Sequence, residues 1–159
     1  MENRLSRETS PYERLVHRPR SPQDNAWPLG TSTSVFALPR LYELTGRDEY
    51  RERAEEVFQR YGAAAAQNPF GFSHLLAALD VSRRPVSIVL AGGRVEAAAL
   101  VEAVHRSDHS ARVLAFSEDV PIGQGRRPVG GQPAAYVCRN RSCDAPVTSA
   151  QALLEWCAA

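Results

Sequence analysis

Two cysteines near the C-terminus have the type and spacing that could carry chemistry. Cys138 and Cys143 are separated by four residues, and one loop can bring their Cα atoms within the roughly 7 Å that a disulfide requires. One thiolate can attack an oxidised neighbour, which would make the pair a reversible redox site, and Arg139 and Arg141 would favour the thiolate. Our preferred interpretation is that these cysteines and Cys157 are reduced and mostly buried as small hydrophobic side chains.

The cysteine spacing does not predict a metal centre. A structural zinc site needs four ligands, and the sequence offers no second cysteine pair, with His105 and His109 as the nearest approach to a histidine pair. The G-x-S-x-G elbow, the H-E-x-x-H helix and the C-x-x-C redox pair are all missing from the sequence. We therefore predict no metal, no cofactor and no catalytic residues, and we lean toward a protein that is not an enzyme.

A strand and a helix are expected to position the cysteine loop. The short apolar run from Ala134 to Val137 follows two glycines and Pro133, which is typical of a buried strand. Thr148 is expected to cap a closing helix. That helix has an apolar stripe at helical spacing, made of Ala152, Leu153, Trp156 and Cys157.

Residues 22–84 are predicted to form a helical segment. Apolar side chains follow helical spacing from Val35 to Leu44, where Gly46 is a natural stop and Pro39 should kink or split the helix. A second helix beginning near Asp48 completes an αα-hairpin, and a third spans about residues 72–79. The preceding residues 1–21 are polar and are expected to form a flexible arm.

Residues 85–159 are predicted to form a small α/β module. A strand at 86–90, a helix at 95–105 and a strand at 112–116 make a βαβ unit, whose two strands should be parallel. Adding the strand at 134–137 gives a small, mostly parallel sheet. The expected fold class is α/β, in the mixed α+β sense.

Composition restricts the class of protein. The chain has 159 residues, 43% hydrophobic and 23% charged, as is ordinary for a soluble globular chain. The formal charge of +1 argues against a nucleic-acid binder. Neither a secretory signal nor an apolar run long enough to span a membrane is recognised. We therefore expect no membrane partner and a cytoplasmic location, in which three cysteines would be reduced.

The cysteine loop also resembles a known family. Tyr136-Val-Cys-Arg-Asn, followed by Cys143-x-Ala-Pro-Val-Thr, is similar to the C-terminal signature of the thioredoxin-domain proteins related to spermatogenesis-associated protein 20. Those proteins have a thioredoxin-like domain, a helical (α/α)6 toroid similar to N-acylglucosamine 2-epimerase, and a small α/β terminal part. The resemblance implies that residues 22–84 correspond to the last toroid helices and that the rest corresponds to the terminal part.

The resemblance also implies a candidate ligand pocket. The segment from Asp24 to Ser32 is similar to a family motif, Asp-x-Ala-x-Pro-Ser-Gly-Asn-Ser, at the mouth of a toroid helix. We therefore take Asp24, Asn25 and Ser32 as candidate pocket residues. Leu29 and Thr31 replace the serine and asparagine of the motif, which predicts a weakened sugar site.

Two classes of function follow from these observations. The favoured one is a non-catalytic accessory or interaction module, a remnant or split part of a thioredoxin and toroid protein. Its expected partner is a second copy or a separate polypeptide carrying the thioredoxin and toroid parts. The alternative is a small sugar-binding or sugar-phosphate-binding protein or enzyme using the cleft between hairpin and sheet, or a thiol redox protein using Cys138 and Cys143.

Overall fold

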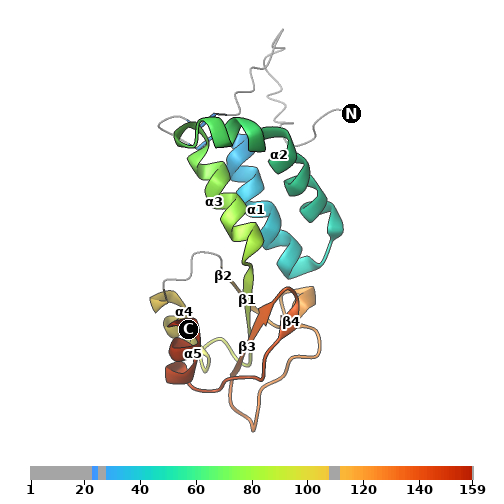
Figure 1. The fold of residues 1–159 in the computed structure, drawn as a ribbon. Coiled ribbons are helices and arrows are strands. Elements are labelled where there is room, and N and C mark those ends of the chain that lie inside the picture. The colour runs from blue at the N-terminus through green and yellow to red at the C-terminus, as the bar shows by residue number, and fades with distance from the viewer. Residues whose placement is uncertain (1–22, 25–27, 108–111, 159) are drawn as a thin grey trace, which may run out of the picture.

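The computed structural model describes residues 23–24, 28–107 and 112–158. The predicted arm at residues 1–21 and the candidate pocket residue Asn25 lie outside the described residues. Three helices form a layer at one end of the molecule, and a sheet with two further helices forms the other end (Figure 1). The fold is therefore of the mixed α/β class. No helix in the described ranges is both long and apolar enough to cross a membrane.

The helical layer is an αα-hairpin completed by a third helix. Helix α1 spans Gly30–Thr45 and α2 spans Asp48–Gln67, and the short η2 at Phe70–Phe72 leads into α3 at Ser73–Arg83. Helix α1 runs without interruption through Pro39, so the predicted split is wrong. Gly46 ends α1 in the left-handed conformation, at φ 72°, as predicted.

The apolar face of this hairpin is covered within the described chain. Val35 is fully buried and Val57 is 7% exposed, because both pack in a core to which α3 contributes Leu75 and Ala78. Phe36 and Phe58 pack at the edge of the same core. The third helix therefore buries the apolar face that further toroid helices would otherwise have to cover.

Strand β1, at Val86–Ala91, is the centre of the sheet and follows directly from α3 (Figure 1). All six of its residues are buried. Because side chains alternate along a strand, Val86, Ile88 and Leu90 pack in one core with α4, at Ala98–Arg106, and α5, at Ala150–Ala158. Val89 belongs to the opposite face and packs in a second core with Leu44 of α1. Both faces of β1 are thus covered.

The sheet is mixed, which corrects the predicted mostly parallel arrangement. Its order is β2-β1-β3-β4, with β2 at Arg112–Phe116, β3 at Ala134–Arg139 and β4 at Ser142–Cys143. Of the strand pairs in the described part of the chain, β1 and β2 alone are parallel, as the βαβ unit predicts. Strand β3 is antiparallel to β1 because it begins opposite Ala91, at the edge where β2 has just ended, and the connection does not cross the sheet.

Candidate functional site

A pocket of about 560 Å³ lies between the helical layer and the β3–β4 hairpin. This volume is within the 300–1,000 Å³ range of small-molecule sites. Its walls come from the last turns of α1 and α3, from the first half of α2 and from the tip of the hairpin. The lining residues are Pro39, Tyr42, Glu43, Arg51, Ala54, Glu55, Phe58, Gln59, Leu79, Ser82, Arg83, Pro85, Asn140 and Arg141.

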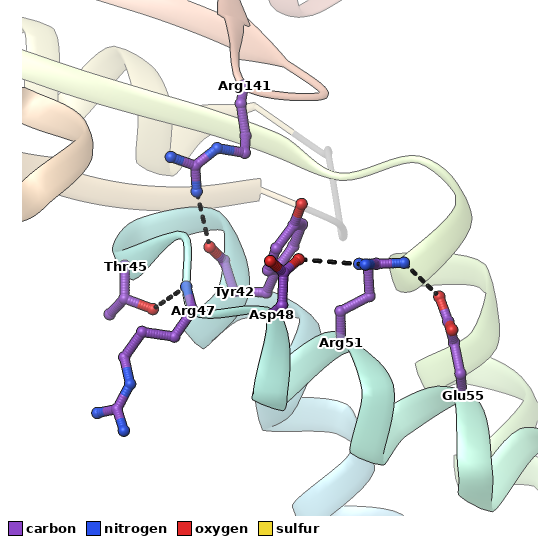
Figure 2. Close-up of polar contacts among 7 residues, drawn as sticks. All are labelled: Tyr42, Thr45, Arg47, Asp48, Arg51, Glu55 and Arg141. Atoms are coloured by element: carbon purple, nitrogen blue, oxygen red, sulfur yellow. Dashed lines mark hydrogen bonds and ion pairs between the residues drawn. The ribbon is translucent and has the colours of Figure 1, made fainter.

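A two-residue turn brings the hairpin to this pocket. Asn140 and Arg141 join β3 to β4 with φ angles of 49° and 64°. Two consecutive positive φ values are the signature of the tight turn whose twist matches paired antiparallel strands. The side chain of Arg141 reaches from this turn to the end of α1, where Nη1 donates to the carbonyl oxygen of Tyr42 at 3.4 Å (Figure 2).

The end of α1 is shaped to receive this guanidinium. The same Tyr42 carbonyl accepts a hydrogen bond from the Gly46 amide at 2.7 Å. A Cβ atom added at Gly46 would collide with the guanidinium of Arg141. The Tyr42 ring faces the same cation, 5.7 Å from ring centroid to guanidinium carbon. The glycine therefore both ends the helix and makes room for Arg141.

Arg51 of α2 is held by two carboxylates on its own helix. Its guanidinium bonds to Asp48 at 3.1 Å and to Glu55 at 3.2 Å (Figure 2). The hydrogen bond that Arg51 donates to Asp48 and the charge of Glu55 raise the pKa of Arg51. Because its charge is already compensated, Arg51 shapes the wall of the pocket more than it attracts a ligand.

Glu43 of α1 is a buried carboxyl that lies where the helical layer meets strand β1. Only 3% of its surface is exposed, and it accepts a hydrogen bond at 3.4 Å from the hydroxyl of Ser87, which is fully buried in β1. Burial raises the pKa of Glu43, while the bond from Ser87 and the charge of Arg141 partly oppose that rise. Local sequence patterns could not indicate this contact, because the two residues lie 44 positions apart.

Two cations of the pocket are not neutralised. Within the described ranges, neither Arg83 nor Arg141 forms an ion pair, although the charge of Arg141 reaches Glu43. Arg84, the neighbour of Arg83, is by contrast paired with Asp80 at 2.5 Å and does not line the pocket. The pocket therefore offers two guanidinium groups to an anion.

The cysteine pair lies at the base of the same hairpin, as a disulfide. Cys138 and Cys143 face each other across β3 and β4, with Cα atoms 3.8 Å apart. The preferred expectation of reduced cysteines is therefore wrong for this pair, because the tight turn places the two sulfurs opposite one another. Cys157 of α5 is a free thiol.

Among the described residues, the guanidinium that bonds to a sulfur of this pair is that of Arg126, and not that of Arg139 or Arg141 as predicted. Nη2 of Arg126 donates to Sγ of Cys143 at 2.7 Å. Arg139 instead packs its guanidinium over the Trp156 ring, 4.0 Å from the centroid, and lies 3.6 Å from the carboxylate of Asp144. Sequence spacing could not reveal Arg126, since it lies 17 residues before Cys143.

Asp24 and Ser32 do meet, but their contacts are with helix ends. The Ser32 hydroxyl donates to Asp24 Oδ1 at 2.5 Å, the Leu29 amide donates to the same oxygen at 3.2 Å, and the His74 amide donates to Oδ2 at 3.1 Å. Asp24 thus caps the beginnings of α1 and α3. Eleven residues of helix, or about 16 Å, separate Ser32 from Glu43 in the pocket.

Burial alone would raise the pKa of Asp24, but its hydrogen bonds reverse the effect. The hydroxyl of Ser32 and the amides of Leu29, His74 and Leu75 together lower the pKa below the ordinary value of 3.8. A charged carboxylate is therefore stabilised here.

The ligand-binding role of Asp24, Asn25 and Ser32 stays a prediction. In the described ranges, no three side chains of the metal-binding types are grouped together.

The amino-acid sequence of this chain is similar to those of several known proteins. Human spermatogenesis-associated protein 20 is 27% identical over 146 residues, which cover 84% of this chain and 19% of that protein. An uncharacterized protein of Caenorhabditis elegans is 29% identical over 144 residues, covering 84% and 20%. The rat spermatogenesis-associated protein 20 is 23% identical over 146 residues, covering 84% and 18%.

These matches confirm the family resemblance predicted from the sequence. The chain spans about a fifth of the length of the curated relatives it matches. No family model matches the chain. No solved structure matches it either.

Proposed function

We propose that this chain, a distant homologue of spermatogenesis-associated protein 20, is a non-catalytic accessory module that binds a sugar phosphate between its helices and its sheet. The observation that supports the proposal is the pocket itself, in which Arg83 and Arg141 have no ion-pair partner within the described ranges. Both the ligand class and the accessory role follow from what surrounds these two cations.

The charges of the pocket favour an anionic group. Its lining contains three guanidinium groups, of which Arg51 is compensated by Asp48 and Glu55. Arg83 and Arg141 remain for a ligand, and the planar fork of guanidinium donors matches the oxygens of a phosphate. A phosphate would also compensate the cation of Arg141, which forms no ion pair within the described ranges.

The remaining lining suits a sugar. Tyr42 and Phe58 supply aromatic rings, and Pro39 and Leu79 supply aliphatic surface. Gln59 and Asn140 supply amide groups that can bond to ring hydroxyls, and the Ser82 hydroxyl, which donates to the Leu79 carbonyl oxygen at 2.7 Å, can accept such a bond. This mixture of apolar walls and a few polar groups is typical of small-ligand sites.

The described acids of the pocket support binding more than catalysis. Glu43 accepts a bond from Ser87, and Glu55 is engaged with Arg51. A general acid or base must instead be free to exchange a proton with a bound substrate. Holding both carboxyls in structural contacts therefore supports a binding role.

The family supports an accessory role. The resemblance implies a toroid similar to a sugar epimerase, and the matched region is about a fifth of each relative. We propose that this module works with thioredoxin-like and toroid parts on a separate polypeptide. A cytoplasmic location is part of the same proposal, since sugar phosphates are intracellular ligands.

Calorimetric titration with a hexose 6-phosphate at low salt tests the proposal. We expect saturable binding, and we expect Arg83→Gln or Arg141→Gln to weaken it about tenfold or more, because a hydrogen bond to a charged group contributes about 1.5–3 kcal/mol. The matched control is Arg84→Gln, which removes a neighbouring guanidinium that does not line the pocket. Free hexose should bind more weakly than its phosphate.

Two results would contradict the proposal. One is an absence of saturable heat with every hexose phosphate tested on folded protein. The other is an equal loss of affinity in the Arg83→Gln and Arg84→Gln proteins, since that would show only a general effect of charge.

A further inference from the structure

Outside the pocket, the partly buried guanidinium of Arg126 contacts the disulfide. Arg126 belongs to the connection between β2 and β3, and its Nη2 donates to Cys143 Sγ at 2.7 Å. Nη1 donates to the Gln124 carbonyl oxygen at 3.1 Å. Nε is buried and has no hydrogen-bond partner in the described part of the chain. Among the described residues, no carboxylate pairs with this guanidinium.

Such a cation is poorly compensated while the sulfurs are bonded to each other, because a disulfide is neutral. Reduction would place a titratable thiol against it, and a nearby cation favours the thiolate. We infer that Cys138 and Cys143 form a thiol–disulfide exchange site, in which Arg126 stabilises the thiolate of Cys143 and Cys143 is the cysteine that exchanges with a dithiol partner. This inference is independent of the sugar-phosphate proposal.

Exposure assigns different roles to the two sulfurs. Cys138 is fully buried in β3 among Val89 and Ile122, whereas Cys143 is half-buried in the short edge strand β4. An external thiolate can therefore reach the sulfur of Cys143 more readily. Cys138 is then the resolving cysteine.

The exchange is a two-electron transfer between a dithiol and this disulfide. A partner thiolate attacks Cys143 Sγ, the S–S bond breaks, and its electron pair leaves on Cys138 Sγ, which takes up a proton. The second thiolate of the partner then attacks the partner's own sulfur in the mixed disulfide. Cys143 leaves as the thiolate that Arg126 stabilises, and the partner is oxidised to a disulfide.

Other described charged and polar groups near the hairpin have contacts away from the sulfurs. The carboxylate of Asp144 bonds to the indole of Trp156 at 3.3 Å and lies 3.6 Å from Arg139. Arg141 reaches Tyr42 of α1. The Tyr136 hydroxyl donates to the Arg127 carbonyl oxygen at 2.8 Å. Arg126 is thus the charged side chain that bonds to Cys143. Arg139→Gln is a suitable control, because it removes a nearby charge that does not bond to Cys143.

Alkylation measured against pH tests the assignment. In reduced protein carrying Cys157→Ser and Cys138→Ser, we expect the midpoint for modification of Cys143 by iodoacetamide to lie below the ordinary thiol value of about 8.5. Arg126→Gln should raise this midpoint by about one pH unit or more. Arg126→Lys, which keeps the charge, should raise it less, and Arg139→Gln should leave it unchanged.

Trapping with glutathione disulfide tests the roles of the two sulfurs. The Cys138→Ser protein should accumulate a mixed disulfide at Cys143, whereas Cys143→Ser should form little or none at the buried Cys138. Air-oxidised protein with three free thiols, or a Cys143 midpoint near 8.5 in the protein that retains Arg126, would overturn the inference. Neither of these two results depends on whether Arg126→Gln folds.

Discussion

Asp24 joins the beginnings of two helices with a single carboxylate. Its two oxygens accept bonds from the Ser32 hydroxyl and the Leu29 amide at α1 and from the His74 amide at α3. Its own amide donates to the Gly71 carbonyl oxygen at 2.7 Å. The family motif around Asp24 therefore has a structural explanation in this chain, because a helix N-terminus attracts an anionic acceptor.

We predict that Asp24→Ala lowers the free energy of unfolding at pH 7 by about 1–3 kcal/mol, since it removes capping bonds from two helices. The folded-state pKa of Asp24 is lowered below 3.8. Its contribution is therefore fully present above pH 3.8 and is lost as the pH falls below that value. Urea titrations of both proteins at pH 7 and at pH 3 measure the difference.

The difference between the two proteins should shrink at pH 3. Asp80→Asn is the control, since Asp80 pairs with Arg84 at the surface, where such pairs contribute little. A loss that is as large at pH 3 as at pH 7 would show that charge on Asp24 is not what stabilises the helices.

At the scale of elements, the end of α1 and the β3–β4 turn form one contact. Gly46 leaves the space into which Arg141 extends, and its positive φ also ends the helix. The disulfide joins the strands on either side of the turn that presents Arg141. The position of this pocket cation therefore depends on both the helix end and the hairpin.

We predict that Gly46→Ala lowers the free energy of unfolding by about 1–2 kcal/mol, because an L-residue in the left-handed region is strained and its Cβ meets Arg141. Gly62→Ala is the matched control. Gly62 lies inside α2 with open space around it, so alanine there should stabilise by about 0.5–1 kcal/mol. Equal effects of the two changes, measured by thermal melts, would contradict this account.

Most elements could be predicted from the sequence, because hydrophobic periodicity reports which residues are buried together. The helices around Val35 and Asp48 and the strands at 86–90 and 112–116 were recognisable in this way. Periodicity carries no strand direction, so the antiparallel pairing of β3 was missed. The cap of α5 was also misplaced by one residue, since Ser149 and not Thr148 accepts the Ala152 amide.

The candidate site was less predictable than the fold. Its residues come from three helices and a turn, and the bond from Arg141 to Tyr42 joins positions 99 apart. The cysteine spacing did indicate a possible disulfide, but the contact with Arg126 depends on how a long connection folds back. Both features are properties of tertiary structure, which local spacing does not report.

At the scale of the whole molecule, the helical layer and the sheet share a boundary. Leu44 of α1 packs in one core with Val89 of β1, and Glu43 accepts the bond from Ser87. The predicted division into residues 22–84 and 85–159 stays a prediction. The pocket needs both parts, because helices and hairpin each supply lining residues.

We predict a monomer that unfolds in one transition. The large apolar side chains exposed in the described ranges lie on four separate segments, at Leu41, Phe70, Val95 and Val129, and the helical face is already covered by α3. Light scattering after size-exclusion chromatography, together with a thermal melt, measures both properties. A stable dimer, or two separate transitions, would show that the helical layer needs a mate.

Whether a sugar phosphate binds in this pocket can be measured by heteronuclear NMR titration of the oxidised protein with a hexose 6-phosphate. We expect saturable shifts at the ends of α1 and α3 and at the Asn140–Arg141 turn, with little change around Asp24. The Arg84→Gln protein should bind with the same affinity as the unchanged protein. Saturable shifts centred on Asp24 and Ser32 would place the ligand at the helix beginnings and contradict the pocket, and an absence of shifts would contradict the binding function itself.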